Sequence, residues 1–330
     1  MIEVSELSKE FKLPKKYEGL GGAVKSFFSR EYTIKHAVSN LSFSLENDET
    51  LGFIGINGAG KSTTIKVLTG LMKPTSGKCV VNGLVPYESR ELYTRNIGVV
   101  FGNRSQLWWD LPVSESFSVL KKIYEIPDDR YTANLSYLKE VLELEEFYLT
   151  PVRNLSLGQR MRADIAASLL HNPSVLFLDE PTIGLDILVK EKIRKALKYI
   201  NLTFHTTIFL TTHDLDDIEE ICEKIIVIDS GKKIFDGKIG ELKQRFGDER
   251  SLIVEKSEDS LFKFDPALLP YEDAIRQKRM EDGKLQLSFK NSEVNLPELM
   301  RFIVANHNIK DLSIKDSQLE DIIKGIYNTK

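Results

Sequence analysis

Gly55-Ile56-Asn57-Gly58-Ala59-Gly60-Lys61-Ser62 is the stretch of sequence that decides the fold. It fits the pattern G-x-x-x-x-G-K-[ST] of a phosphate-binding loop. The apolar run at residues 50–54 predicts a strand before it, and residues 63–70 predict a helix that ends at a glycine. A strand, a loop and a helix in this order are the context in which the pattern is specific.

Three glycines, a lysine and a serine give this loop its expected chemistry. Because Gly55, Gly58 and Gly60 lack Cβ atoms, the backbone can wrap closely and direct several N–H groups at one anion. The helix N-terminus adds partial positive charge, Lys61 adds a full charge for the β- and γ-phosphates, and the Ser62 hydroxyl can ligate Mg²⁺. The residues that we expect to bind a nucleoside triphosphate here are Gly55, Asn57, Gly58, Ala59, Gly60, Lys61, Ser62 and Thr63.

Two adjacent acids follow a second apolar run, Val175-Leu176-Phe177-Leu178. Such a run is typical of a buried parallel strand, and α/β sheets bind ligands at the carboxyl ends of their strands. Asp179 is suited to hold Mg²⁺, directly or through water, and Glu180 to accept a proton from an attacking water. The alternative, two acids in an ordinary turn, is less favoured because a phosphate-binding loop lies upstream.

A third segment, Asn154-Leu155-Ser156-Leu157-Gly158-Gln159-Arg160-Met161-Arg162, predicts the start of a helix. Ser156 is suited to cap this helix, and the backbone N–H groups at its start could bind an anion. The residues alone favour a capped helix over an anion site.

Composition sets the broad class of the protein. The chain has 330 residues, a net charge of −4, and only two cysteines, Cys79 and Cys222, which form no metal or redox pattern. The acidic balance gives no general reason to expect nucleic-acid binding. We find no basic and apolar leader at the N-terminus and no apolar run long enough to span a bilayer, so we expect any membrane role to act through a partner.

Strands that alternate with helices predict an α/β fold with a parallel sheet. The expected P-loop NTPase core spans residues 1–245, with an insertion at about 12–36 and a helical subdomain at about 103–172. From about Gly247 short strands and helices follow a different pattern, so residues 246–330 are expected to form a small α+β accessory domain. The insertion is rich in lysine and includes Phe27 and Phe28. A solvated insert is a more favoured interpretation of it than a membrane contact.

Five motifs in order resemble the nucleotide-binding subunits of ABC transporters, over about residues 1–240. They are the phosphate-binding loop, Leu155-Ser156-Leu157-Gly158-Gln159, Asp179-Glu180-Pro181, Gly184-Leu185-Asp186 and Thr211-Thr212-His213-Asp214. In that family two such domains face each other, and each ATP lies between the phosphate-binding loop of one and the Leu-Ser-x-Gly-Gln segment of the other.

The resemblance implies a role for each matched residue. Ser156, Gly158 and Gln159 would contact ATP bound to the partner protomer, and Asp186 would link the two subunits. Glu180 would be the catalytic base and His213 a γ-phosphate contact, with Lys61 as the third catalytic group. The implied partners are an integral-membrane permease and a second copy or a homologous ATPase subunit. The implied location is the cytoplasmic face of the membrane, with ATP and Mg²⁺ bound.

Two positions depart from the family pattern. Leu157 stands where the family most often has a second glycine, which should leave the contacts of Ser156 and Gly158 intact. The glutamine expected after the strand that ends at Phe101 is displaced. Counting along the segment puts Asn103 at that position, as a third ligand for Mg²⁺, and Gln106 is the competing residue.

An aromatic residue usually stacks on adenine in this family, and two residues compete for that role. Phe11 ends the first predicted strand, and Tyr32 lies five residues before Ala37, a spacing also seen in the family. In the family, the segment that holds Trp108 and Trp109 meets the permease. A packed, buried loop is an equally weighted interpretation of that segment. With the insertion and the accessory domain, this segment resembles export-type ATPases that serve ABC-2-like permeases.

Two other function classes remain as alternatives. One is a non-transport ABC ATPase that acts on ribosomes or nucleic acid, although such translation factors usually carry two sets of these motifs and this chain has one. The other is a binding module whose ATPase is incidental, against which the intact Lys61, Asp179, Glu180 and His213 argue. We expect an ATP-hydrolysing exporter subunit that binds no nucleic acid.

Overall fold

The structure, a computed structural model, describes residues 1–14, 32–102, 104–256, 272–279 and 284–328. It divides into two compact units, Met1–Gly237 and Lys238–Lys330. The division falls before the predicted boundary at residue 245, so that helix α9 belongs to the second unit. No helix in the described ranges is both long enough and apolar enough to cross a membrane.

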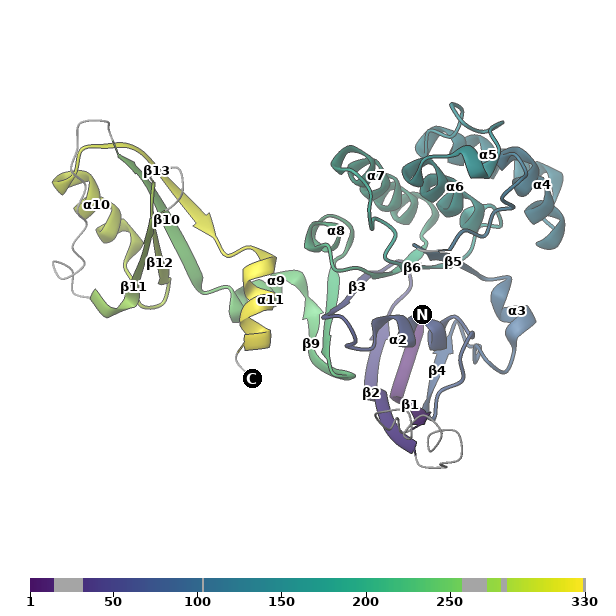
Figure 1. Cartoon of the computed structure of the whole chain (residues 1–330), viewed down its shortest axis with the longest axis horizontal. Helices are drawn as coiled ribbons and strands as arrows, with labels where there is room; N and C mark the ends of the chain where they lie inside the picture. The colour runs from purple at the N-terminus through teal and green to yellow at the C-terminus, as the bar shows by residue number, and fades with distance from the viewer. Residues whose placement is uncertain (15–31, 103, 257–271, 280–283, 329–330) are drawn as a thin grey trace, which may run out of the picture. The chain divides into compact units, whose positions relative to one another are not determined.

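A six-stranded sheet forms the centre of the first unit, in the order β5-β6-β7-β3-β8-β9 (Figure 1). The pairs β5–β6, β6–β7, β7–β3 and β3–β8 are parallel, which confirms the predicted α/β class. Its strands have these bounds: β3 Thr50–Gly55, β5 Ile97–Phe101, β6 Val175–Asp179, β7 Thr207–Thr211, β8 Lys224–Asp229 and β9 Lys232–Lys238.

A second, antiparallel sheet has the order β2-β1-β4. Its strands are β1 Ile2–Pro14, β2 Tyr32–Leu45 and β4 Ser76–Val81. The strands β1 and β2 remain paired as far as Pro14 and Tyr32, so residues 12–14 and 32–36 belong to a long hairpin. The predicted insertion at about residues 12–36 therefore begins and ends within these two paired strands. Its middle part, including Phe27 and Phe28, lies outside the described residues.

The helices of the first unit cover the sheets and extend to one side of them. α4 and α5 both contact α6, and α6 contacts β5, so these helices form a group beside the β5 edge of the sheet (Figure 1). The helices have these bounds: α2 Lys61–Leu68, α3 Arg90–Thr94, α4 Val113–Ile123, α5 Asp128–Val141, η1 Val152–Asn154, α6 Leu157–Leu169, α7 Ile187–Phe204 and α8 Leu215–Ile221.

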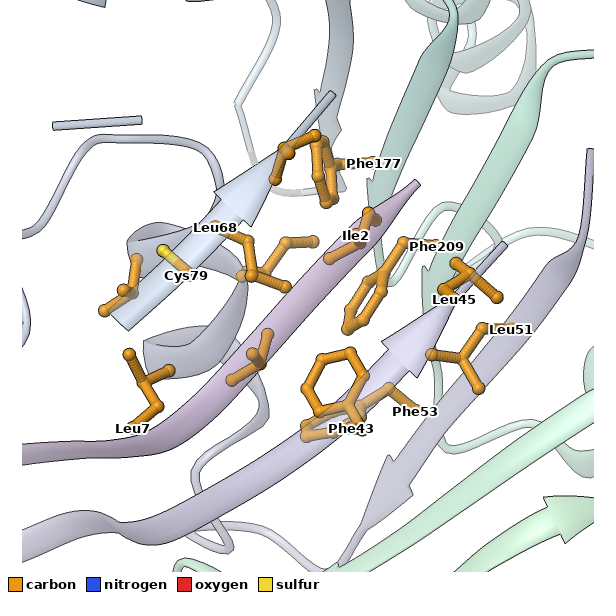
Figure 2. Packing of buried hydrophobic residues seen from close by; sticks show 14 of the residues in the cluster. Ile2, Leu7, Phe43, Leu45, Leu51, Phe53, Leu68, Cys79, Phe177 and Phe209 are labelled. Carbon is orange, nitrogen blue, oxygen red and sulfur yellow. The ribbon is translucent and has the colours of Figure 1, made fainter. Parts of the chain in front are cut away.

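The core of the first unit lies between the two sheets. Figure 2 shows Phe43 of β2, Phe53 of β3 and Phe209 of β7 close together, with ring centroids 5.4–6.2 Å apart. Phe177 of β6 continues this cluster beside Phe209. Because aromatic rings bury a large apolar area, this cluster fixes β3, β6 and β7 relative to the antiparallel sheet. The loops that follow these three strands carry the candidate site.

The second unit is a four-stranded antiparallel sheet with helices, as predicted for an α+β accessory domain. Its strand order is β11-β12-β10-β13, and Leu252, Leu287 and Phe289 pack with Leu299 and Ile303 of α10. Its elements are α9 Ile239–Phe246, β10 Glu249–Lys256, η3 Glu272–Ala274, β11 Ile275–Arg279, β12 Leu285–Lys290, α10 Leu296–Asn306, β13 Ile309–Asp316 and α11 Leu319–Asn328.

Candidate active site

The phosphate-binding loop joins β3 to α2, as the sequence predicts. Gly58 and Gly60 have φ values of +85° and +112°, which side chains with a Cβ rarely adopt. A Cβ on Gly60 would also lie 2.4 Å from the carbonyl oxygen of Ala37 on β2. The antiparallel sheet therefore holds the loop from behind, and nothing lies within 4 Å of the position of a Cβ on Gly58. The loop has the shape of a cradle with room on its open side.

Lys61 begins helix α2 and is buried. Its Nζ donates a hydrogen bond to the carbonyl oxygen of Gly55, over 2.6 Å, across the mouth of the loop. Burial lowers the pKa of Lys61, while the negative charges of Glu180 and Asp179 act in the opposite direction. A cation and the N-terminus of a helix thus meet at one point, which is the arrangement that an anionic phosphate requires.

The predicted acids lie at the carboxyl end of β6. Asp179 Oδ1 accepts a hydrogen bond from the Thr211 hydroxyl of β7, over 2.5 Å, and Glu180 N–H donates to the Thr211 carbonyl, over 2.8 Å. Glu180 has a φ of +55°, an unfavourable backbone conformation for a residue with a side chain. The neighbouring strand β7 therefore holds the carboxylate of Asp179 and the backbone of Glu180.

Glu180 and His213 form a hydrogen-bonded pair. The Nδ1 atom of His213 lies 2.6 Å from Glu180 Oε2, and the backbone N–H of His213 donates to the same oxygen over 3.3 Å. His213 lies just after β7, so two parallel strands bring together residues that are 33 positions apart. A carboxylate with an imidazole at this distance can take a proton from water and remain oriented while it does so.

One cleft of about 920 Å³ contains the predicted phosphate loop, the acid and the histidine. Its wall also includes Phe11 and Lys35 of the β1–β2 hairpin. Tyr32, at the far end of the described hairpin, is 58% exposed and is not among the lining residues. The lining residues are Phe11, Leu13, Lys35, Ala37, Gly55, Ile56, Asn57, Gly58, Gly60, Lys61, Ser62, Thr63, Glu180, Ile183 and His213.

The Leu-Ser-x-Gly-Gln segment forms the N-terminus of α6 and does not line this cleft. Gln159 N–H donates to Ser156 Oγ over 3.1 Å, and Ser156 N–H donates to Gln159 Oε1 over 2.9 Å, which is a complete capping box. The capped helix that the residues alone favour is therefore present. Gly158 is buried against α7, where a Cβ would lie 2.8 Å from Val189 Cγ1. Ser156 and Leu157 remain exposed.

Asp186 caps helix α7. Its Oδ1 accepts a hydrogen bond from the backbone N–H of Val189, over 3.0 Å. It is absent from the lining of the cleft, as Ser156 and Gly158 are. Within one chain the structure therefore separates the predicted site residues into a cleft group and an outer group on the N-termini of α6 and α7.

Of the two candidates for the displaced glutamine, Asn103 lies outside the described residues. Gln106 points toward α6, where its Nε2 donates to the carbonyl oxygen of Asp164, over 2.9 Å. The carboxylate of Asp164 accepts from the Ser105 hydroxyl and from the Gln106 N–H, over 2.9 and 3.0 Å. Burial raises the pKa of Asp164 to about 6. The Gln106 amide is therefore already engaged on the helical side.

The two tryptophans are both exposed, Trp108 by 39% and Trp109 by 53%. The guanidinium of Arg160 on α6 lies over the Trp109 ring, 5.6 Å from its centroid. The interpretation of this segment as a buried loop is wrong, since only Leu107 beside them is buried.

Sequence reasoning missed a group of residues directly behind the site. Thr182, Thr212, Arg194 and Asp217 are buried near Glu180 and His213, and the side chains of the first three donate hydrogen bonds to the carboxylate of Asp217. Asp217 lies in an acidic run with Asp216 and Glu220, and nothing in the residue pattern distinguishes a buried acid from its exposed neighbours. Only the pairing of α7 with α8 reveals it.

Comparison with known proteins shows which family has this fold and these motifs. A family model described as "ABC transporter" matches residues 38–183. Nod factor export ATP-binding protein I of Ralstonia nicotianae is 36% identical over 216 residues, which are 64% of this chain and 66% of that protein. The chain belongs to the ABC transporter family. Its matched part is an ABC ATP-binding domain, and the predicted resemblance and P-loop NTPase fold are confirmed.

Other ABC proteins match more of the chain. Linearmycin resistance ATP-binding protein LnrL of Bacillus subtilis is 29% identical over 88% of this chain and 93% of its own length. The methionine import ATP-binding protein MetN of Haemophilus influenzae is 33% identical over 73% of this chain and 66% of its own. The chain spans about a third to two thirds of the length of the first curated relatives that it matches.

A solved structure shares the arrangement of the ABC ATP-binding domain. The dimeric ATP-binding cassette MJ0796, in a post-hydrolysis state bound to ADP and Pi, superposes with a TM-score of 0.60 at 26% identity. The match covers 72% of this chain and 99% of that one.

Oxygen atoms suited to Mg²⁺ are present in the cleft region. Ser62 places an exposed hydroxyl at the start of α2, and Asp179 places a carboxylate at the end of β6. Hydroxyl and carboxylate oxygens are the ligands that Mg²⁺ takes when phosphates complete its shell. Among the described residues there is no cluster of three His, Cys, Asp or Glu side chains that could hold a metal ion.

Proposed function

We propose that this chain binds and hydrolyses ATP and uses the cycle to drive a separate membrane permease. The observation that carries the proposal is the single cleft in which Lys61 at the start of α2 faces the Glu180–His213 pair. A nucleotide-binding site without hydrolysis would need the loop but not a carboxylate held in an unfavourable backbone conformation beside it.

The residues of the chain divide the chemistry between them. The backbone N–H groups of the loop and the Lys61 ammonium hold the β- and γ-phosphates and neutralise charge that moves onto the leaving oxygen. Glu180 orients the attacking water and takes its proton, while His213 fixes the carboxylate and contacts the γ-phosphate. Ser62 and Asp179, with Asn103 as a further ligand, would hold Mg²⁺, which would supply positive charge at the phosphates.

The other half of the site comes from a second copy or a homologous subunit. In support, Ser156, Gly158, Gln159 and Asp186 lie outside the cleft of their own chain, while Ser156 and Asp186 sit at the starts of two helices. A helix N-terminus is suited to a phosphate. These residues would therefore close over ATP held by the partner, and ATP binding would join the two chains.

Phe11 would stack on adenine in preference to Tyr32. Phe11 lines the cleft beside the phosphate loop, and its partner across the hairpin, Lys35, lines it as well. An aromatic face next to a bound phosphate is where a purine can pack.

The permease would bind at the exposed tryptophans, and the chain would lie at the cytoplasmic face of the membrane through that contact. Exposed aromatic residues are typical anchors of protein interfaces.

An export role is supported by the relatives named for Nod factor export and linearmycin resistance. Residues 1–245 would be the ATP-binding domain, with its helical subdomain at 103–172, and residues 246–330 the accessory domain.

Glu180→Gln tests the hydrolytic role. The amide keeps the size of the carboxylate but cannot accept the proton, so ATP hydrolysis by the purified chain should fall by about 100-fold or more. The affinity for ATP, measured by titration calorimetry, should stay within about twofold of wild type, whereas Lys61→Ala should lose binding. Hydrolysis at the wild-type rate in the Glu180→Gln variant would show that Glu180 is not the base.

A further inference from the structure

Asp217 on α8 has an environment that its sequence position does not suggest. It is fully buried, and three side chains from three other parts of the fold donate hydrogen bonds to its carboxylate. Oδ2 accepts from the hydroxyls of Thr182 and Thr212, the latter over 3.2 Å. Oδ1 accepts from Nε of Arg194 on α7 over 2.6 Å.

The two threonines flank the catalytic pair in the chain. Thr182 lies two residues after Glu180, in the loop that follows β6, and Thr212 lies directly before His213, after β7. One carboxylate oxygen therefore fastens the Glu180 loop and the His213 loop to the same point. The Glu180–His213 hydrogen bond joins the same two loops a second time.

Arg194 holds Asp217 in place from α7. Its other nitrogens donate to Glu220, over 3.1 Å, and to Asp214, over 3.3 Å. Asp214 also accepts from Lys190 Nζ over 2.6 Å, and its own N–H donates to the Thr212 hydroxyl over 3.0 Å. The network thus joins α7, which Asp186 caps, to the loop that carries His213.

Stability alone is a weak explanation for this cluster. Burying a carboxylate and a guanidinium costs much of what their attraction returns, and an apolar packing of the same volume often serves a fold as well. A buried acid that accepts three hydrogen bonds does fix geometry, because each donor has one favourable direction. The residue that needs such fixing is Glu180, whose positive φ is unfavourable unless the surrounding loop is held.

We propose that Asp217 is a positioning residue that fixes the relative positions of Glu180 and His213 through its hydrogen bonds with Thr182 and Thr212. This proposal rests on the proposed ATPase function and adds residues that act on its catalytic pair. None of the four residues of the Asp217 cluster, meaning Asp217, Thr182, Thr212 and Arg194, is among the residues that line the nucleotide cleft. It acts on the rate of hydrolysis and leaves nucleotide binding unchanged.

Thr182→Val is the main test, because valine matches threonine in shape and lacks the donor. We expect kcat for ATP hydrolysis to fall by about 10- to 100-fold, with the dissociation constant for ATP within about twofold of wild type. Thr182→Ser keeps the hydroxyl and should restore kcat. Asp216→Asn, an exposed neighbour of Asp217, is the matched control and should behave as wild type.

A double-variant cycle separates positioning from a general structural effect. If Thr182 acts through Glu180, then Thr182→Val should cause no further loss in a Glu180→Gln chain. Losses that multiply, or a wild-type kcat in Thr182→Val, would overturn the proposal. Thr212→Val gives the same test from the His213 side and serves where Thr182→Val does not fold.

The two proposals fail in different ways. If wild type hydrolyses ATP and Glu180→Gln abolishes it while Thr182→Val and Thr212→Val both keep full kcat, only the positioning role is wrong. If wild-type chain shows no hydrolysis that depends on Glu180, both proposals are wrong.

Discussion

At the scale of single residues, the site depends on side chains held in unusual surroundings. Lys61 is a buried cation, Glu180 has a positive φ, and Gly60 lies where a Cβ would meet a backbone carbonyl. The buried charge of Lys61 and the positive φ of Glu180 each cost free energy, and position 60 accepts only a glycine because a Cβ there would clash. Such costs are typical of active sites, because groups that are already in place can bind a charged ligand and orient a reacting water without rearranging.

Asp164 provides a residue-scale test that uses pH. Burial raises its pKa from the usual 3.8 to about 6, so the folded state binds this proton more tightly than the unfolded state does. Its protonation therefore stabilises the fold fully below pH 3.8, and that contribution is lost as the pH rises to about 6. Above that pH the ionised carboxylate costs up to roughly 3 kcal/mol.

Asp164→Asn removes this titration while its amide oxygen can still accept the bonds from Ser105 and Gln106. In denaturant unfolding, the stability of the Asp164→Asn variant relative to wild type should increase between about pH 4 and pH 7. An offset between the two chains that is the same at every pH would contradict the raised pKa.

At the scale of elements, the sequence predicts best those strands and helices that are buried in a regular way. β3, β6 and β7 are continuous apolar runs, so their positions and the site residues at their carboxyl ends could be predicted. The paired hairpin ends at residues 12–14 and 32–36 are not predicted as strands, and their side chains are exposed on both faces. The residue pattern also showed no sign of β13, a largely exposed edge strand of sequence IKDLSIKD, or of α3, which has five residues.

Some residues of the candidate site could also be predicted from the sequence, and others could not. Its loop, acids and histidine are carried by local motifs, and the structure brings Lys61, Glu180 and His213 to one cleft. Thr182, Arg194 and Asp217 could not be predicted, because their roles depend on how α7 packs beside α8. The sequence also does not indicate that Phe11 lines the cleft and Tyr32 does not, since both residues are aromatic and both lie in the hairpin.

At the scale of the whole molecule, the permease contact can be tested at the two tryptophans. A tagged chain, purified from detergent-solubilised native membranes, should bring down a protein with several membrane spans, identified by mass spectrometry. Trp108→Ala with Trp109→Ala should reduce that recovery by about tenfold, because exposed aromatic anchors contribute much of the binding energy of an interface. Tyr199→Ala, which changes an exposed aromatic residue on α7, is the matched control. Recovery of ribosomal proteins or nucleic acid in place of a membrane protein would contradict the transport role.

One chain is proposed to hold only half of each working site, and ATP-driven pairing tests this most directly. The mass of the Glu180→Gln variant in solution should double when Mg²⁺ and ATP are added, measured by light scattering or sedimentation, because hydrolysis cannot reopen the pair. ADP should not support the change, and a second substitution, Ser156→Arg, should abolish it by blocking the phosphate contact from the partner. A mass that saturating ATP leaves unchanged, or doubling that survives Ser156→Arg, would contradict a site formed by two copies of this chain.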